Sequence, residues 1–278
     1  MTPVGKTDLH LHTTASDGIL TPAELVAAAV KNGLQNMAVT DHDTTAGVDP
    51  ALAAASHYPG LLVIPGIELA ADVASGEVHV LGYFLDQHDP ALEAALTLFR
   101  DSRRNRARQM LEKLANLGMP LDWSEVEALA KGASVGRPHV AEALVRRGYV
   151  GSIREAFDRF IGRECPAYVE RHKLTPPDAV ALIRKAGGAA VLAHPGFVHE
   201  LARWLEEMVE AGLAGLEVYY PTHSREVEQD LLCICRDRGL IPTGGSDYHG
   251  QMGPNEAPMG SMPVPADTIP RLRAAAGS

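Results

Sequence analysis

Two pairs of metal-capable side chains stand near opposite ends of the chain. Asp8-Leu9-His10-Leu11-His12 lies near the start, and Ser246-Asp247-Tyr248-His249 lies near the end. Because residues two apart in an extended strand share a face, His10 and His12 point to the same side, and the second pair repeats the arrangement. Two convergent imidazoles are typical of a metal site. The sequence therefore predicts a metal site built from both ends of the chain.

Further candidate ligands lie in or just after other apolar runs, where a bare carboxylate or imidazole needs a partner. The full set is His10, His12, Asp17, His42, Glu68, His79, His194, Asp247 and His249. So many donors exceed the needs of one ion and suit three divalent ions that keep open positions, with one carboxylate bridging. Imidazole and carboxylate ligation without thiolate favours manganese, iron or zinc over calcium.

The elements that must position these side chains are seven short apolar runs alternating with alanine-rich helical stretches. The runs are 6–12, 36–42, 61–69, 78–84, 189–194, 215–220 and 240–246. This alternation predicts a parallel α/β architecture. Nearly every run ends in His, Asp or Glu, and barrel active sites lie at that carboxyl rim. We therefore expect a closed barrel rather than an open sheet.

The helix after the first run carries its own start and stop signals. Thr21 is placed as the N-cap, Pro22 as the first helical residue and Glu24 as the partner of the cap. Asn32-Gly33 is a typical helix end.

Between Pro90 and about Pro166 the pattern becomes helical without an intervening strand. This predicts two domains: a barrel carrying the metal site, formed by 1–98 and 166–278, and a helical insertion, 99–165, that covers the active site.

Composition limits the possible partners and location. The chain has 278 residues, 46% of them hydrophobic, and its formal net charge is -10. That charge argues against binding of long duplex nucleic acid, which requires many phosphates to be neutralised. With neither a membrane-length apolar run nor a leader pattern, we expect a cytoplasmic protein that does not bind membranes. The cysteines, Cys165, Cys233 and Cys235, are interpreted as packing thiols.

Three motifs together resemble those of the PHP (polymerase and histidinol phosphatase) phosphoesterases. They are Asp8-Leu9-His10-Leu11-His12-Thr13-Thr14-Ala15-Ser16-Asp17-Gly18, Thr40-Asp41-His42-Asp43 and Gly245-Ser246-Asp247-Tyr248-His249. The resemblance implies a distorted seven-stranded (β/α)7 TIM-like barrel with a trinuclear metal centre, for which manganese is the expected metal and iron or zinc the alternatives. Asp17 departs from the pattern because many relatives have histidine there.

The resemblance also implies how the ligands divide among the ions. His10, His12, Glu68 and Asp247 would hold one ion. Glu68, His79 and His194 would hold a second, and Asp17, His42 and His249 a third.

The match is closest to the stand-alone branch with a helical insertion, whose members resemble nucleoside 3',5'-bisphosphate phosphatases and 5'-3' exonucleases acting on short RNA. The expected reaction is therefore metal-assisted hydrolysis of a phosphate ester by in-line attack on phosphorus. The expected partner is a small phosphorylated nucleotide or the 5' end of a short RNA.

Arginines in the insertion are the first candidates to bind the substrate. The apolar stripe Leu92, Leu96, Phe99, Met110, Leu114 and Leu117 continues through Arg103 and Arg106. Guanidinium groups grip phosphate oxygens in a bidentate manner, so these two arginines are predicted to face an anionic ligand. Buried salt bridges are the alternative.

Three further residues are predicted to contact phosphate. Ser134 and Arg137 flank a glycine before a proline-started helix, and His223 follows the sixth run. For His223, the alternative is an exposed loop histidine.

Two residues are candidates for proton transfer to the leaving group. Asp43, next to His42, is the first choice and His194 the second. The alternative role for Asp43 is to orient a ligand.

Two rival functions remain open at this stage. The first is phosphatase action on a small molecule of the histidinol phosphate type, which would leave the arginine helix without a purpose. The second is a non-catalytic metal-binding scaffold, against which the complete ligand set argues.

Overall fold

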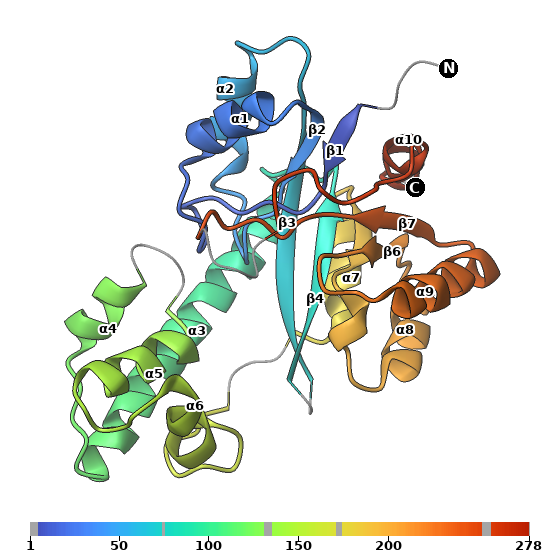
Figure 1. Cartoon of the computed structure of the whole chain (residues 1–278). Coiled ribbons are helices and arrows are strands. Elements are labelled where there is room, and N and C mark those ends of the chain that lie inside the picture. Colours follow the sequence, from blue (N-terminus) through green and yellow to red (C-terminus); the bar gives the residue numbers. More distant parts are fainter. Residues whose placement is uncertain (1–4, 74–75, 131–134, 171–173, 252–256, 278) are drawn as a thin grey trace. The chain divides into compact units, whose positions relative to one another are not determined.

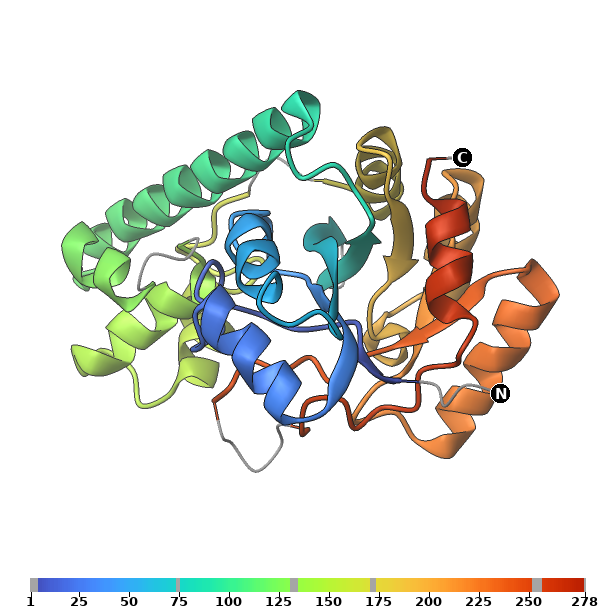
Figure 2. The same ribbon diagram turned by 90° about the horizontal axis from the view of Figure 1, so that it is seen from above.

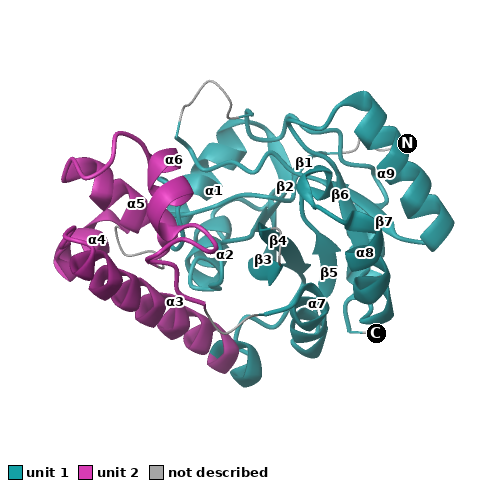
Figure 3. Ribbon diagram, turned by 90° about the horizontal axis from the view of Figure 1, so that it is seen from below, with its two compact units in different colours: residues 1–93, 173–278 teal, residues 94–172 magenta. Residues whose placement is uncertain are grey.

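The architecture was analysed in a computed structural model that describes residues 5–73, 76–130, 135–170, 174–251 and 257–277. The chain forms two compact units, residues 1–93 with 173–278 and residues 94–172 (Figure 3). The first unit contains every strand of the described residues, and the second unit is helical.

Seven strands form one sheet in chain order, from β1 to β7. Their bounds are β1 Lys6–Asp8, β2 Leu34–Val39, β3 Leu62–Val73, β4 Gly76–Tyr83, β5 Ala189–Leu192, β6 Gly215–Tyr219 and β7 Ile241–Gly244. Each of the seven predicted apolar runs overlaps a strand, and β2, β3 and β4 extend beyond their runs. Several runs extend past the strand end, because the residues that follow turn toward the site.

The prediction of a purely parallel sheet is wrong at β4. This strand pairs antiparallel with both β3 and β5, whereas β1–β2, β2–β3, β5–β6 and β6–β7 are parallel. The long hairpin of β3 and β4 stands out in Figure 1. Because β4 runs in reverse, its first half lies at the same rim as the carboxyl ends of its neighbours. This reversal explains why His79 can join the site from inside a strand.

Side-chain alternation along the strands separates two layers of core. Ala38 of β2 belongs to a cluster with Leu9, just after β1, and with Ile64 of β3 and Val191 of β5. Met37, the residue before it, packs instead with residues of α1. The sheet is therefore apolar on both faces, as expected where helices cover its outer face.

The helices of this unit pack against the strands, and Figure 2 shows them from above. Their bounds are α1 Pro22–Lys31, α2 Val48–Ala55, α7 Pro176–Lys185, α8 Leu201–Glu210, α9 Arg225–Arg238 and α10 Thr268–Ala275, with a short 3-10 turn η2 at Pro195–Phe197. The predicted start of α1 is confirmed, since the Thr21 side chain and the Glu24 side chain form a capping box. Its predicted end is confirmed by Asn32 at the C-cap and by Gly33 at φ 76°.

The two edges of the sheet approach one another without a full ladder between β1 and β7 among the described residues. The Leu9 N–H donates to the Gly244 carbonyl at 3.4 Å, and Leu11 forms an isolated parallel bridge with Tyr248. The expected closure of the barrel is thus incomplete among the described residues, and a distorted, barrel-like seven-stranded sheet brings the segment after β1 beside the segment after β7.

The second unit has a core of its own. Its elements are most of α3 Pro90–Asn116, then α4 Trp123–Leu129, α5 Arg137–Arg146, α6 Ile153–Ala156 and the π-helical turn η1 Phe157–Ile161. Met110 and Leu114 of α3 pack there with Val126 and Leu144. This unit begins at residue 94 and ends at 172, where the sequence placed the insertion at 99–165.

Two residues depart from their predicted environment. Leu117, assigned to the apolar stripe, is 46% exposed because α3 ends at Asn116, beyond which the helical period no longer sets direction. Cys233 is exposed on α9, whereas Cys235 is buried, so only the latter is clearly a packing thiol.

No helix of the described residues is long and apolar enough to cross a membrane.

Candidate metal centre

The segment after β1 points two imidazoles into the barrel mouth. His10 and His12 are fully buried, with ring centroids 5.1 Å apart. Leu9 and Leu11, which alternate with them, are buried in two different core clusters. The predicted alternation therefore holds, and it aims both rings at one place.

Four side chains from three parts of the chain form the first group of donors, the buried His10, His12 and Glu68 and the partly exposed Asp247. The Nε2 atom of His10 lies 3.2 Å from Glu68 Oε2 and 3.2 Å from Asp247 Oδ1. The Nε2 atom of His12 lies 3.3 Å and 3.1 Å from the same two oxygens. None of these four atoms has a hydrogen-bond partner among the described residues.

These four unpartnered atoms fit a cation. His10 Nδ1 lies 2.9 Å from Glu217 Oε1, a contact that, in the neutral ring, places the hydrogen on Nδ1 and leaves Nε2 as an acceptor. Because the surrounding carboxylates raise the pKa of His10 despite its burial, the site demands a positive charge at Nε2, which either a proton or a metal ion can supply. Four tetrahedral donors at bonds of about 2.0 Å lie about 3.3 Å apart, close to the observed spacings. The donor set therefore fits a divalent ion.

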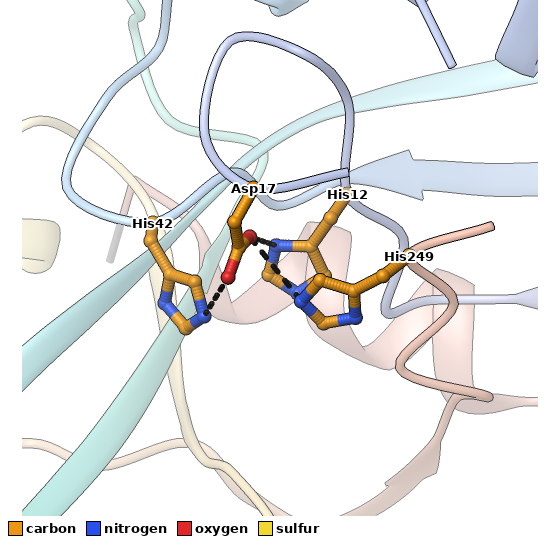
Figure 4. A group of neighbouring side chains, drawn as sticks. All are labelled: His12, Asp17, His42 and His249. Carbon is orange, nitrogen blue, oxygen red and sulfur yellow. Dashed lines mark ion pairs between the residues drawn. The ribbon is translucent and has the colours of Figure 1, made fainter. Parts of the chain in front are cut away.

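The second group is His12, Asp17, His42 and His249, drawn in Figure 4. Asp17 Oδ1 lies 3.2 Å from His249 Nε2, and Asp17 Oδ2 lies 3.8 Å from His42 Nε2. The rings of His12 and His249 are stacked at 4.1 Å. Because His249 Nδ1 donates to the Asp247 carbonyl at 2.9 Å, its Nε2 is the atom directed at Asp17.

Glu68 joins the first group to the third, which is His42, Glu68 and His79. Its Oε2 lies 3.0 Å from His42 Nδ1, and its Oε1 lies 2.8 Å from His79 Nδ1. His194 Nε2 lies 3.3 Å from the same Oε1. The structure thus brings all nine predicted ligands together, with Glu68 where a bridging carboxylate was expected. The geometry adds His42 to the donors around Glu68.

The pKa values of two imidazoles beside Glu68 are shifted in opposite directions. Burial lowers the pKa of His42, and it prevails over the attraction of Glu68, so the pKa falls to about 4. Burial opposes protonation of His79 as well, but there Glu68 and Glu77 together outweigh it and raise the pKa to about 10. One carboxylate therefore supplies too little negative charge for all the buried imidazoles around it to be protonated at the same time. Metal cations avoid this conflict because they bind the neutral rings.

Buried carboxylates that sequence analysis missed hold the ligands in place. Glu217 Oε1 accepts from His10 Nδ1, and its Oε2 accepts the His194 backbone N–H at 2.8 Å. Asp8 accepts the backbone N–H groups of His10, Ser246 and Gly260. For both Glu217 and Asp8, the sequence signal that could have predicted this role is a carboxylate within an apolar run.

Asp41 and Tyr220 support the site from two other strand ends. Asp41 accepts the Thr13 N–H at 2.7 Å and the Ser16 hydroxyl at 2.6 Å, and so closes the loop that carries Asp17. The Tyr220 hydroxyl donates to Asp247 Oδ2 at 2.9 Å. Asp41 stands in one of the three motifs that resemble the PHP phosphoesterases. In the sequence analysis, a role was assigned to its neighbour His42 but none to Asp41.

Backbone strain is concentrated at this centre. Asp43, His194 and Asp247 have φ angles of 50°, 30° and 53°, in the left-handed region that residues with a side chain rarely adopt. Such strain persists only where surrounding contacts enforce it, and it is typical of functional sites.

The two candidates for proton transfer lie in different surroundings. Asp43 is buried, and its Oδ1 accepts the Ala70 N–H at 3.1 Å, next to the strand position that bears Glu68. His194 is partly exposed, and its ring faces Glu68. Asp43 therefore holds the backbone of β3, the strand that carries Glu68.

The predicted phosphate contacts lie in both units. On α3, Arg106 is buried and Arg103 is half-buried. Arg137 lies over the Phe157 ring at 5.5 Å, and Ser134 lies outside the described residues. His223 has both ring nitrogens engaged: Nδ1 donates to the Val218 carbonyl at 2.9 Å, and Nε2 accepts the Gly196 N–H at 3.3 Å.

Known proteins resemble the chain over nearly its whole length. Residues 8–115 match the PHP domain family. The "5'-3' exoribonuclease Rnm" of Salmonella typhimurium is 36% identical, over 87% of this chain and 84% of the relative. A "3',5'-nucleoside bisphosphate phosphatase" of Chromobacterium violaceum is 34% identical, over 87% and 86%. A crystal structure from Bifidobacterium adolescentis, described as a metal-dependent phosphoesterase, has a TM-score of 0.81 and 32% identity, over 99% and 97% of the two chains.

Fold, donor groups and relatives together define a metal-dependent phosphoesterase. The chain belongs to the PHP family.

Proposed function

We propose that the nine clustered side chains hold three divalent ions and that manganese is the native metal, with iron or zinc as alternatives. Three overlapping donor groups support three ions, because His12, His42 and Glu68 each belong to two groups. Imidazole and carboxylate donors without thiolate support this choice of metals. When bound, such ions lower the pKa of water and stabilise charge that develops on phosphate oxygens.

The proposed reaction is hydrolysis of the 3'-phosphate of nucleoside 3',5'-bisphosphates, such as adenosine 3',5'-bisphosphate, to AMP and phosphate. The four unpartnered donor atoms at the centre carry the phosphoesterase assignment, and the names of the relatives support the nucleotide. The second candidate is stepwise removal of nucleotides from the 5' end of short 5'-phosphorylated RNA. The exoribonuclease relative of 36% identity favours it.

The chain's own residues divide the remaining work in this proposal. Arg103 and Arg106 bind the phosphate that is not hydrolysed, with Ser134 and Arg137 as further phosphate contacts, whereas both ring nitrogens of His223 are already engaged within the protein. A guanidinium remains charged at every relevant pH, so it suits this task. Asp43 or His194 passes the proton to the leaving oxygen. Asp43→Asn and His194→Asn would distinguish the two, because only loss of the true proton donor removes the alkaline limb of the pH–rate profile.

The test is a side-by-side turnover assay with manganese. Adenosine 3',5'-bisphosphate, a 5'-phosphorylated dinucleotide and histidinol phosphate are compared for wild type and for Arg103→Ala/Arg106→Ala. The matched control is Arg146→Ala/Arg154→Ala, which removes two positive charges of exposed i,i+4 pairs from the same unit.

We expect the nucleotides to be hydrolysed faster than histidinol phosphate and the Arg103/Arg106 variant alone to lose that preference. Faster hydrolysis of histidinol phosphate would overturn the substrate assignment. Lack of turnover with every ester would indicate the non-catalytic scaffold.

A further inference from the structure

Four rings form a continuous shelf next to the metal-binding groups. They belong to His194, Phe197, Tyr220 and His223, and we call them the ring shelf. The Phe197 ring centroid lies 6.2 Å from His194, 5.9 Å from Tyr220 and 6.2 Å from His223. Tyr220 lies 5.4 Å from His194 and 5.3 Å from His223.

Phe197 is the outer surface of the shelf. It is 58% exposed, the largest exposed fraction among the large hydrophobic side chains of the described residues. Burial of a phenylalanine side chain is strongly favourable, so a flat ligand that covers this ring would gain free energy of binding from it.

The exposed ring is nevertheless held in a fixed place. The Phe197 N–H donates to the His194 carbonyl at 3.1 Å within η2, and the Gly196 N–H donates to His223 Nε2. His223 is itself anchored to the Val218 carbonyl of β6. A Cβ at position 196 would lie 2.8 Å from the His223 ring, so the turn needs glycine there. The shelf is therefore preorganised, which reduces the entropy lost when a ligand binds.

Two contacts join the shelf to the metal-binding groups. The Tyr220 hydroxyl donates to Asp247 Oδ2 at 2.9 Å, and His194 Nε2 lies 3.3 Å from Glu68 Oε1. A substrate with its phosphate at the donor groups would thus have the shelf immediately beside it.

We propose that the shelf is the base-binding subsite, in which the nucleobase of the substrate stacks on Phe197. This inference rests on the proposed nucleotide substrate and adds what recognises the base. Every nucleobase has a π face, so an aromatic ring binds bases with little regard to their sequence.

The same shelf limits selectivity among bases. The Tyr220 hydroxyl donates to Asp247, and both nitrogens of His223 are engaged within the unit. The shelf thus stacks a base without offering a dedicated donor to its edge. We therefore expect nucleotides of all four bases to be accepted, with purines favoured by their larger ring area.

The first experiment measures kcat and KM of Phe197→Ala, Phe197→Leu and Phe197→Trp. The substrates are adenosine 3',5'-bisphosphate and 1-deoxyribose 3,5-bisphosphate, which has both phosphates and no base. Ile153→Ala is the matched control, because Ile153 is also a large exposed apolar residue, at 49%.

Loss of stacking should raise KM for the nucleotide about tenfold in the Ala and Leu variants and leave kcat nearly unchanged. Phe197→Trp should retain wild-type KM, and none of the variants should alter the reaction of the abasic compound. Equal effects on both substrates, or no effect on either, would overturn the subsite.

A binding measurement separates this inference from the proposed activity. AMP should quench the added tryptophan fluorescence of Phe197→Trp, relative to wild type with its own Trp123 and Trp204. Quenching without turnover of nucleotides would retain the subsite and reject the proposed reaction. Turnover without quenching would retain the reaction and reject the subsite.

Discussion

The carboxylate of Glu217 lies 2.9 Å from His10 Nδ1, and both side chains are fully buried. The same carboxylate accepts the backbone N–H of His194, a residue in a strained left-handed conformation. One side chain of β6 therefore fixes the ring of one candidate ligand and the backbone of another. A carboxylate behind a histidine ligand also makes its metal-binding nitrogen more basic.

Replacement of Glu217 by Gln should weaken metal binding while the fold persists. The Gln amide keeps the size of the side chain but removes its charge, and one of its two ends presents a donor where acceptors are needed. We expect manganese affinity to fall about 10- to 100-fold, with activity partly restored at high manganese. Metal titration by calorimetry measures the change. Glu207→Gln, at an exposed i,i+4 pair with Arg203, is the control. Unchanged affinity in Glu217→Gln would show that this carboxylate does not support the site.

Gly245 should not tolerate a methyl group. A Cβ at this position would lie 2.3 Å from the His10 Cβ and 2.6 Å from the His10 backbone nitrogen. Gly245→Ala should push His10 out of register, lower the free energy of unfolding by about 1–3 kcal/mol and reduce bound metal. Thermal unfolding in EDTA, with metal analysis after dialysis, tests both effects.

Gly60→Ala provides the control because nothing lies within 4 Å of a Cβ there. It should leave metal content unchanged and alter stability by less than about 1 kcal/mol. Equal metal content in Gly245→Ala and Gly60→Ala would contradict the proposed role of the close contact.

Patterns of two kinds were readable from the sequence. Short apolar runs located all seven strands, and motif spacing located the donors that the structure brings together, such as His10 and Asp247. Both signals are local, because each depends only on neighbours along the chain. Strand direction is not local, since a short apolar run looks the same in parallel and antiparallel pairing. For that reason the reversal of β4 escaped prediction.

The carboxylates that support the ligands were not predicted, for a related reason. Glu217 stands inside a strand without a neighbouring histidine, and only the fold places it against His10. The prediction that Leu117 is buried was wrong because the helical period was extended one residue past the end of α3. Helix ends are set by the competition between intrahelical bonds and the turn that follows, here at Gly118 with φ 82°.

Asp8 should be essential for stability because it joins the two ends of the barrel. It accepts the Ser246 hydroxyl at 2.6 Å, together with backbone N–H groups from three segments. In Asp8→Asn one oxygen becomes a donor that faces another donor. The free energy of unfolding should fall by about 2–3 kcal/mol, which urea denaturation measures. Asp237→Asn, on the exposed surface of α9, is the control and should have little effect. Matching midpoints for the two variants would contradict the assignment.

The two neighbouring cysteines of α9 should react very differently. Burial raises the pKa of the Cys235 thiol from its ordinary value of 9.0 to about 11, whereas Cys233 is exposed. Because the thiolate is the nucleophile, a disulfide reagent at pH 8 should modify Cys233 quickly and Cys235 only after unfolding.

Between pH 9 and about pH 11 the unfolded chain loses the Cys235 proton while the folded chain keeps it. The free energy of unfolding should therefore decrease as pH rises through this window. Labelling rates of Cys233→Ser and Cys235→Ser test the first expectation, and the same variants compared by urea denaturation at pH 8 and pH 10 test the second. Fast labelling of Cys233→Ser beyond what Cys165 accounts for would show that Cys235 is accessible after all.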